Sequence, residues 1–397
     1  MKNILLISEL YPLPTKENQS TRVCHFFTRE WVKMGYNVVV IHFQPVHCLF
    51  WHLAVRYFGD FLRNRLGGIY YAKKIKDTEQ YLIDDVQVFR IPIYNFIPRG
   101  RFKKLSLDNF ISKVYSALDN VRFIPDVIIG HMMPIEVIPT INMRYHVKTC
   151  MVSHSVSLKI KKRYPDYQEL IDSYDLWGFR SKPIKEKHVS FFGEPKKWFY
   201  CLSGIPGDFI VEKNPHNYNN VLTSFLYVGD LIARKHPDAL LKAIPRLCNN
   251  DFSITYIGEG AERNQLNAII ASEQLQRKVA FTGKINRTEI LSYYDKSDCM
   301  IMISHNEAYG LVYLEAMARG CITIASRDEG FDGVIVDGEN GFLCKAGDSE
   351  ELASIIKRIN KMSPEERKRI SDNALQTAKG LTDVLAAKSY IEEIEKL

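Results

Sequence analysis

Short apolar runs alternate with amphipathic stretches along the N-terminal half of the chain. The runs Asn3–Ile7, Asp126–Gly130 and Thr149–Ser153 are too brief for helices and are typical of buried parallel strands. The stretches Thr21–Lys33 and Leu105–Val121 have the spacing of helices with one apolar face. This alternation predicts an α/β protein with a mostly parallel, doubly wound sheet. The same patterns predict further elements at Asn37–Phe43, Val86–Ile91, Ile135–Met143 (helix), Leu176–Arg180 and Trp198–Leu202.

A second series of strands and helices follows the turn-forming cluster Gly204-Ile205-Pro206-Gly207. Its expected elements are strands at Thr223–Val228, Ser253–Ile257, Val279–Thr282, Met300–Ile303 and from Ile322, and helices at Asp238–Leu247, up to about Ser272, and at Leu311–Arg319. Three helices are expected to close the chain, Ser349–Met362, Pro364–Lys379 and Thr382–Leu397, the first two capped by Ser349 and Ser363. We therefore predict two Rossmann-like domains, residues 1–205 and 206–381, facing each other across a cleft, with the helix at about 382–397 packing back on the first.

The composition is that of a globular protein with two domains. The 397 residues are 25% charged and 46% hydrophobic. The sequence predicts neither a membrane-spanning segment nor a signal peptide, because its apolar runs are short and the N-terminal run lacks a cleavage site. The eight cysteines are scattered without a paired C-x-x-C motif, so we expect reduced core thiols in a cytoplasmic protein.

Most of the net charge of +7 comes from one segment. Residues 43–104 hold eleven Lys or Arg against five Asp or Glu, together with many aromatic residues. A helix there would gather Phe50, Tyr57 and Phe61 on one face, and a second basic cluster follows at Arg99, Arg101, Lys103 and Lys104. Two interpretations stay open: binding to an anionic membrane at the inner face of the plasma membrane, or packing on the domain's own sheet with a solvated charged rim. Nucleic acid is disfavoured because no binding motif accompanies the charge.

Residues 298–326 carry the most informative pattern: strand, acidic loop, helix, glycine stop, strand. Gly310 opens the helix, whose first N–H groups and dipole favour an anion such as a phosphate. Glu307 and Glu315 flank this turn, and carboxylates suit sugar hydroxyls rather than phosphate. The pattern fits a sugar nucleotide, while an ordinary βαβ unit with two surface acids remains the alternative.

The C-terminal half resembles the nucleotide-sugar domain of glycosyltransferase family 4. The motifs that carry the resemblance occur in the family's order: Tyr227-Val228-Gly229, Arg234-Lys235, Tyr256-Ile257-Gly258-Glu259-Gly260, Phe281-Thr282-Gly283, Ser304, Glu307 to Glu315 with Ala316-Met317-Ala318-Arg319-Gly320, and Asp337-Gly338-Glu339-Asn340-Gly341-Phe342-Leu343. The N-terminal half is similar more faintly, through Pro125 to His131, Ser153-His154 and Ser203-Gly204-Ile205. The resemblance implies the GT-B fold and a retaining transfer of a hexose-type sugar from a nucleoside diphosphate. We expect no metal or other cofactor, because the sequence contains no Asp-x-Asp motif. The resemblance also implies a saccharide or lipid-linked acceptor, as in bacterial surface-polysaccharide synthesis.

The resemblance assigns roles to individual residues. Glu307 would contact the donor sugar, Lys235 would neutralise the leaving phosphate and His154 would lie near the reacting sugar. The expected donor-binding set is Gly229, Arg234, Lys235, Gly258, Gly283, Lys284, Ile285, Glu307, Tyr309, Gly310, Leu311, Val312 and Glu315, the last holding the ribose. Because ligands bind beyond the carboxyl ends of parallel strands, the acceptor-side candidates are Asn18, Ser20 and His131.

The sequence departs from the family pattern in two places. Asp230 stands where an arginine is usual, so either Arg234 supplies the second cation or the diphosphate is held more weakly. The glycine pair expected after the first strand is replaced by the segment Tyr11–Asn18. Two other classes stay open, a sugar-nucleotide-binding scaffold and a GT-B-fold epimerase. A phosphorylase lacks a clear pyridoxal-phosphate lysine, and a dinucleotide dehydrogenase lacks its G-x-G-x-x-G.

Overall fold

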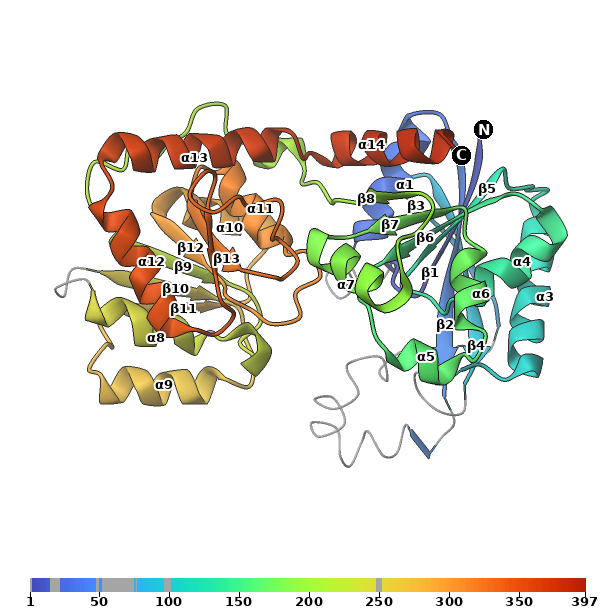
Figure 1. Ribbon diagram of the computed structural model, residues 1–397, viewed down its shortest axis with the longest axis horizontal. Coiled ribbons are helices and arrows are strands. Elements are labelled where there is room, and N and C mark those ends of the chain that lie inside the picture. The colour runs from blue at the N-terminus through green and yellow to red at the C-terminus, as the bar shows by residue number, and fades with distance from the viewer. Residues whose placement is uncertain are drawn as a thin grey trace. The chain divides into compact units, whose positions relative to one another are not determined.

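Two sheets organise the computed structural model, one in each half of the chain (Figure 1). The structure describes residues 2–14, 22–47, 50–51, 75, 77–95, 101–247 and 252–397. Contacts divide the chain into a first unit, Met1–Phe179 with Lys187–Cys201 and Ala387–Leu397, and a second unit, Arg180–Glu186 with Leu202–Ala386. The α/β architecture with two parallel-sheet domains confirms the predicted fold class.

In the first unit the strands follow the order β3-β4-β2-β1-β5-β6-β7-β8. Neighbouring strands run parallel except for β3, which pairs antiparallel with β4 and was not predicted. The strands are β1 Asn3–Ser8, β2 Asn37–Val46, β3 Glu79–Ile83, β4 Val86–Tyr94, β5 Val127–His131, β6 Lys148–Ser153, β7 Leu176–Phe179 and β8 Trp198–Tyr200. The helices of this part of the chain are α1 Val23–Lys33, α3 Lys104–Asn120, α4 Val137–Tyr145, α5 Lys159–Arg163, α6 Tyr167–Asp172 and α7 Lys182–Phe192.

In the second unit the order is β11-β10-β9-β12-β13-β14, and the pairs are parallel. The strands are β9 Ser224–Val228, β10 Ser253–Ile257, β11 Val279–Gly283, β12 Cys299–Ile301, β13 Ile322–Ser326 and β14 Phe342–Cys344. The helices are η2 Gly207–Phe209, η3 Ala233–Lys235, α8 Asp238–Ala243, η4 Ile244–Arg246, α9 Arg263–Ser272, α10 Arg287–Lys296, α11 Leu311–Ala318, α12 Ser349–Lys361 and α13 Pro364–Lys379. The last helix of the chain is α14, Asp383–Glu395.

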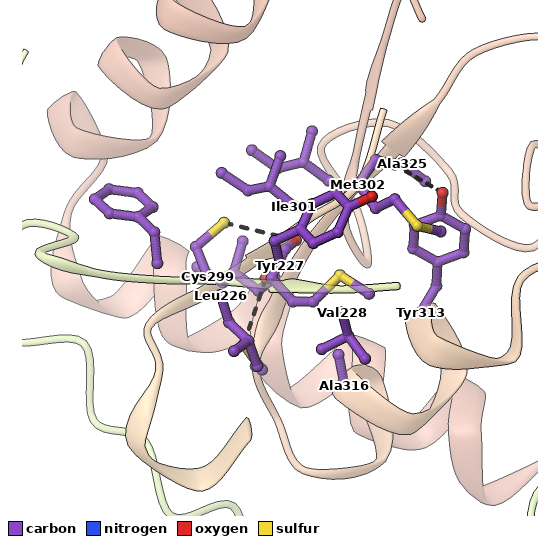
Figure 2. Packing of buried hydrophobic residues seen from close by; sticks show 14 of the residues in the cluster. Leu226, Tyr227, Val228, Cys299, Ile301, Met302, Tyr313, Ala316 and Ala325 are labelled. Carbon is purple, nitrogen blue, oxygen red and sulfur yellow. Dashed lines mark hydrogen bonds between the residues drawn. The ribbon is translucent and has the colours of Figure 1, made fainter. Parts of the chain in front are cut away.

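The core of the second unit fixes the elements on which the candidate site is built (Figure 2). Leu226 and Tyr227 of β9 and Cys299 and Ile301 of β12 are each completely buried. The Tyr313 hydroxyl of α11 donates a 2.7 Å hydrogen bond to the carbonyl of Met302, just after β12. Helix α11 is therefore tied to the end of the strand that precedes the acidic loop.

Of the two predicted helix caps, one differs from the prediction and one is confirmed. The N-cap of α12 is Asp348, whose carboxylate accepts the N–H of Glu351, rather than Ser349. At α13 the predicted cap is confirmed, because Ser363 accepts the N–H of Glu366 and the Glu366 carboxylate accepts the N–H of Ser363.

The structure can be compared with three expectations from the composition: the cysteines, the basic aromatic segment at residues 43–104 and the absence of a membrane-spanning segment. The six cysteines within the described ranges are buried thiols that form no disulfide, as predicted for core cysteines. Of the basic aromatic segment, residues 48–49, 52–74, 76 and 96–100, including Arg99, lie outside the described residues. No helix in the described part of the chain is both long enough and apolar enough to span a bilayer.

Candidate functional site

The loop between β12 and α11 places Glu307 beside the start of a helix. Gly310 is the N-cap of α11 and has a positive φ of 90°, a conformation that favours glycine. A Cβ added at Gly310 would lie 3.4 Å from Cγ of Glu307, so the glutamate side chain lies against the helix start. The N–H groups of Leu311 and Val312 have no intrahelical acceptor, because these residues begin α11. An anion held there would meet both the helix dipole and a carboxylate.

Two cations reach this carboxylate from the segment after β9. Lys235 Nζ lies 3.9 Å and Arg234 Nη1 lies 3.8 Å from Oε2 of Glu307. The Lys235 and Glu307 side chains are only 14% and 16% exposed, so solvent screens this pair less than a surface pair. A Cβ at Gly229 would lie 3.1 Å from Lys235 Nζ, so the end of β9 leaves room for the ammonium group. The predicted grouping of Lys235, Arg234 and Glu307 is present.

Asp230, which stands where the family pattern has an arginine, forms an ion pair with Lys284 of the predicted donor-binding set. Its Oδ1 atom lies 3.6 Å from Nζ of Lys284, and both side chains are more than half exposed. Gly258 and Gly283 follow β10 and end β11, and the N–H of Gly258 donates to the carbonyl of Gly283. Ile285 packs against the core of the second unit. The structure thus places these residues at the carboxyl ends of neighbouring parallel strands, where ligands of such sheets bind.

Glu315 occupies a different environment from the one the sequence suggests. It is 3% exposed, and its Oε1 accepts a 2.7 Å hydrogen bond from Arg287 Nε while its Oε2 accepts one of 3.3 Å from the Tyr294 hydroxyl. Burial raises the pKa of the Glu315 carboxyl, and Arg287 opposes that rise. Each carboxylate oxygen can accept two hydrogen bonds, so a ribose hydroxyl would have to share an oxygen with Arg287 or Tyr294.

Tyr309 is a buried packing residue. Its side chain is 4% exposed, its hydroxyl donates to the carbonyl of Ser203 at 2.8 Å, and the Arg180 guanidinium lies 5.0 Å from its ring centre. A contribution of Tyr309 to donor binding would therefore come from its backbone.

A chain of hydrogen bonds in the first unit links Tyr390, His131 and His154. His131 is fully buried at the end of β5, with Nδ1 3.0 Å from Nε2 of His154 and Nε2 3.0 Å from the hydroxyl of Tyr390. His131 would therefore act on an acceptor through His154 rather than by direct contact. The other acceptor-side candidates, Asn18 and Ser20, lie outside the described residues. Within the described ranges, no group of three or more His, Cys, Asp or Glu side chains is arranged to hold a metal ion.

Three contacts were not predicted from the sequence. Arg287 and Tyr294 belong to α10, a helix that was not predicted. An Asn followed three residues later by a Glu, as at Asn286 and Glu289, is a sequence signal for the start of a helix. In the structure the Glu289 carboxylate accepts the N–H of Asn286 at 3.3 Å, as in a capping box. Tyr390 has no local signal, because its partner His131 is 259 residues away in the sequence.

The comparisons with known proteins agree with the geometry of the second unit. Residues 209–377 match the protein-family model described as "Glycosyl transferases group 1". The glycogen synthase of Mycobacterium tuberculosis is 30% identical over 136 residues, which cover 34% of this chain and 33% of that protein. The lipopolysaccharide core biosynthesis glycosyltransferase LpsE of Rhizobium meliloti is 29% identical over 150 residues, covering 38% and 40% of the two chains. These matches support the prediction of a transferase, although each spans well under half of the relative's length.

The solved structures support the fold over the whole chain. Anabaena Alr3699/HepE in complex with UDP and glucose has a TM-score of 0.67 at 16% sequence identity, and the comparison covers 100% of both chains. This similarity confirms the predicted GT-B class of fold.

Proposed function

We propose that the chain is a retaining, metal-independent glycosyltransferase. It would move a hexose-type sugar from a nucleoside-diphosphate sugar to a saccharide or lipid-linked saccharide acceptor in surface-polysaccharide synthesis. The observation that carries the proposal is the grouping of Lys235, Arg234 and Glu307 beside the N-terminus of α11. The glycosyltransferase group 1 match over the same residues and the UDP and glucose bound by Anabaena HepE support this class of donor.

The chemistry follows from where charge develops. When the bond between the anomeric carbon and the diphosphate oxygen breaks, negative charge grows on the diphosphate and positive charge on the sugar. The Lys235 ammonium, the Arg234 guanidinium and the α11 dipole stabilise the diphosphate without reorganising. The Glu307 carboxylate accepts hydrogen bonds from sugar hydroxyls, and the acceptor oxygen forms the new bond on the face that the diphosphate leaves. The proton of the acceptor hydroxyl passes to the departing phosphate.

The test measures transfer and hydrolysis of UDP-, GDP- and ADP-hexoses by the wild type and two variants. Lys235→Ala should weaken binding of the nucleoside diphosphate by about tenfold or more, because a charge-assisted contact is lost. Glu307→Gln should lower turnover by roughly a hundredfold, with the nucleotide affinity little changed. Lys242→Ala is the control, since Lys242 pairs only with Asp238 on the exposed face of α8 among the contacts described.

Each alternative gives a distinct result. Binding of a sugar nucleotide by the wild type without transfer or hydrolysis would favour a scaffold. Conversion of the sugar nucleotide to an isomer in the absence of an acceptor would favour an epimerase. Full activity in both variants would refute this assignment of the site.

The proposed acceptor class extends to a membrane surface. Lys103 and Lys104 adjoin Leu105 at the start of α3, and Leu105 is 82% exposed. A basic cluster beside an exposed apolar side chain suits an anionic bilayer. Flotation with anionic vesicles should show binding that is weakened by salt and by Lys103→Ala with Lys104→Ala, and equal behaviour with neutral vesicles would contradict it.

A further inference from the structure

Two consecutive residues after β13 hold the backbone of Glu307 from both ends of the residue. The N–H of Glu307 donates a 2.9 Å hydrogen bond to Oε2 of Glu329. The carbonyl of Glu307 accepts a 2.9 Å hydrogen bond from the N–H of Gly330. These bonds lie outside regular secondary structure, since β13 ends at Ser326 and α11 begins at Leu311. They form a clamp on one residue rather than part of a sheet.

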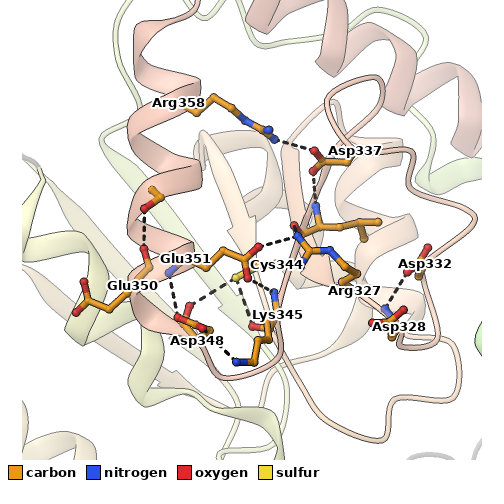
Figure 3. Close-up of polar contacts among 12 residues, drawn as sticks. Arg327, Asp328, Asp332, Asp337, Cys344, Lys345, Asp348, Glu350, Glu351 and Arg358 are labelled. Atoms are coloured by element: carbon orange, nitrogen blue, oxygen red, sulfur yellow. Dashed lines mark hydrogen bonds and ion pairs between the residues drawn. The ribbon is translucent and has the colours of Figure 1, made fainter.

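The clamp has little freedom to shift. A Cβ added at Gly330 would lie 2.4 Å from the backbone nitrogen of Tyr309 and 2.6 Å from the Glu307 carbonyl oxygen, so any other residue would push the two loops apart. Next to Glu329, the N–H of Asp328 donates to the carboxylate of Asp332 at 2.8 Å, as Figure 3 shows.

Both flanks of this loop are anchored to the body of the unit. Arg327 donates a 2.6 Å hydrogen bond to Glu351 of α12, and Arg358 of the same helix donates to Asp337 at 3.0 Å (Figure 3). The Asp337 carboxylate also accepts the N–H of Leu343 in β14. Glu329 therefore projects from a loop whose two ends are fixed.

The segment that carries Glu307 is also held on its other side. The N–H of His305 donates to the carbonyl of Arg234 at 2.7 Å, and Arg234 Nη1 donates back to the carbonyl of His305 at 3.3 Å. Oε1 of Glu329 lies 3.7 Å from Nδ1 of His305, so Glu329 contacts His305 as well as Glu307. Residues 305–307 are thus fixed between the loop after β9 and the loop after β13.

The carboxylate of Glu307 depends on this backbone support. Its Oε2 is buried and has no hydrogen-bond partner within the described part of the chain, and the two cations stand at 3.8 and 3.9 Å, beyond hydrogen-bond distance. The direction of the side chain is therefore set mainly by its backbone. We propose that Glu329 and Gly330 are positioning residues that aim Glu307 at the sugar of the donor, an inference that rests on the proposed function.

If Glu329 and Gly330 position Glu307, their contacts should affect binding and transfer of the donor sugar but not binding of the nucleoside diphosphate. Glu329→Ala should weaken binding of a sugar nucleotide and lower its turnover by about ten- to a hundredfold, because a displacement of about 1 Å can cost that much. The affinity for the free nucleoside diphosphate should change less than about twofold, since the clamp makes no described contact with Lys235. Glu329→Gln should recover most of the loss, because its amide oxygen can still accept the Glu307 N–H.

The experiment compares binding of UDP with UDP-glucose, GDP with GDP-mannose and ADP with ADP-glucose by calorimetry, together with kcat and KM for the pair that binds. Glu339→Ala is the matched control, because it removes an exposed glutamate from the same loop. Hydrogen exchange of residues 305–309 should speed up in Glu329→Ala and not in Glu339→Ala. The melting temperature of each variant reports whether the fold is kept.

Three outcomes would overturn the proposal: an alanine variant as active as the wild type, equal losses for nucleotide and sugar nucleotide, or a Gln variant as impaired as Ala. Failure of the wild type to bind any of the six compounds would instead refute the proposed function. In that case the exchange rate of residues 305–309 still decides whether Glu329 holds Glu307.

Discussion

At the scale of single residues, Glu315 shows how a carboxylate can be placed inside an apolar core. Its side chain is 4% exposed, whereas that of its partner Arg287 is 33% exposed and stacks 4.9 Å from the Phe209 ring centre. Burying a carboxylate is costly unless the charge is paired and hydrogen-bonded. The Arg287 contact therefore supports the helix α11 that carries the candidate anion site.

Removal of Arg287 should destabilise the second unit more than an ordinary surface change. We expect Arg287→Ala to lower the free energy of unfolding by about 2–3 kcal/mol, below the usual cost of breaking a buried pair because Arg287 is one-third exposed. Glu315→Gln in the same protein should recover part of the loss, since it removes the unpaired charge. Urea unfolding of the two single variants and the double variant gives the coupling between the residues, and additive losses would contradict the pairing.

The lowered pKa values of two histidines in the first unit predict how the stability of that unit changes with pH. Burial lowers the pKa of His42 and His188 from 6.5 to about 4, and Arg90 adds to the shift of His42. The folded state therefore keeps both rings neutral while the unfolded chain takes up protons below pH 6.5. Stability is full above pH 6.5 and falls as the pH drops towards 4, by up to about 1.4 kcal/mol per pH unit for each histidine.

The measurement is the urea concentration at the midpoint of unfolding, determined from tryptophan fluorescence at several pH values between 7 and 4.5. His188 packs against the rings of Trp177 and Phe179 with centres 4.6 and 5.0 Å away, so His188→Leu keeps an apolar contact and removes the titrating group. The slope of stability with pH should become shallower in this variant. An unchanged slope would show that the imidazole is not the source.

At the scale of elements, the parts that could be predicted are those whose signal is local. The residues of α11 lie between a glycine with positive φ and Gly320, and β13 is a short buried stretch that contains Ile322 and Ile324, so both were found from the sequence. The antiparallel β3 was missed because three of its five residues are exposed and its apolar stretch, residues 81–83, is short. The contacts of Glu307 with Glu329 and of His131 with Tyr390 were missed because they join residues 22 and 259 positions apart. Local patterns reveal elements, whereas the partners of a functional side chain depend on how the elements meet.

Helix α14 is an element whose packing bears on function. The Tyr390 ring lies edge-on to Phe27 and Trp31, and Trp31 Nε1 donates to the carbonyl of Ala387 at 2.9 Å. Burial raises the pKa of Tyr390, so its hydroxyl stays protonated and can donate to His131. The end of the chain thereby reaches the hydrogen-bonded pair that includes His154.

Tyr390→Phe should keep the ring packing and remove the hydrogen bond to His131. We expect a loss of stability of about 1 kcal/mol and a fall in kcat of about tenfold, with the KM for the donor little changed, because His154 would lose part of its orientation. Tyr36→Phe is the control, since the Tyr36 hydroxyl donates to Glu395 of the same helix without reaching the histidines. Equal effects of the two variants on kcat would contradict a role for Tyr390 beyond packing.

At the scale of the whole molecule, the two units can be observed separately. All four tryptophans, Trp31, Trp51, Trp177 and Trp198, belong to the first unit. The residues predicted to bind the donor, from Gly229 to Glu315, belong to the second. Tryptophan fluorescence therefore follows unfolding of one unit, and hydrogen exchange of β9–β13 follows the other.

This separation makes the location of nucleotide binding testable. UDP or GDP at about a hundred times its dissociation constant should stabilise the second unit by about 2.7 kcal/mol, because only its folded state binds the ligand. Protection of β9–β13 should increase, while the unfolding midpoint seen by tryptophan fluorescence should move much less. Lys235→Ala should abolish most of the added protection, since Lys235 is the less exposed of the two cations next to Glu307. A shift confined to the tryptophan signal would place the nucleotide in the first unit and contradict the proposed donor site.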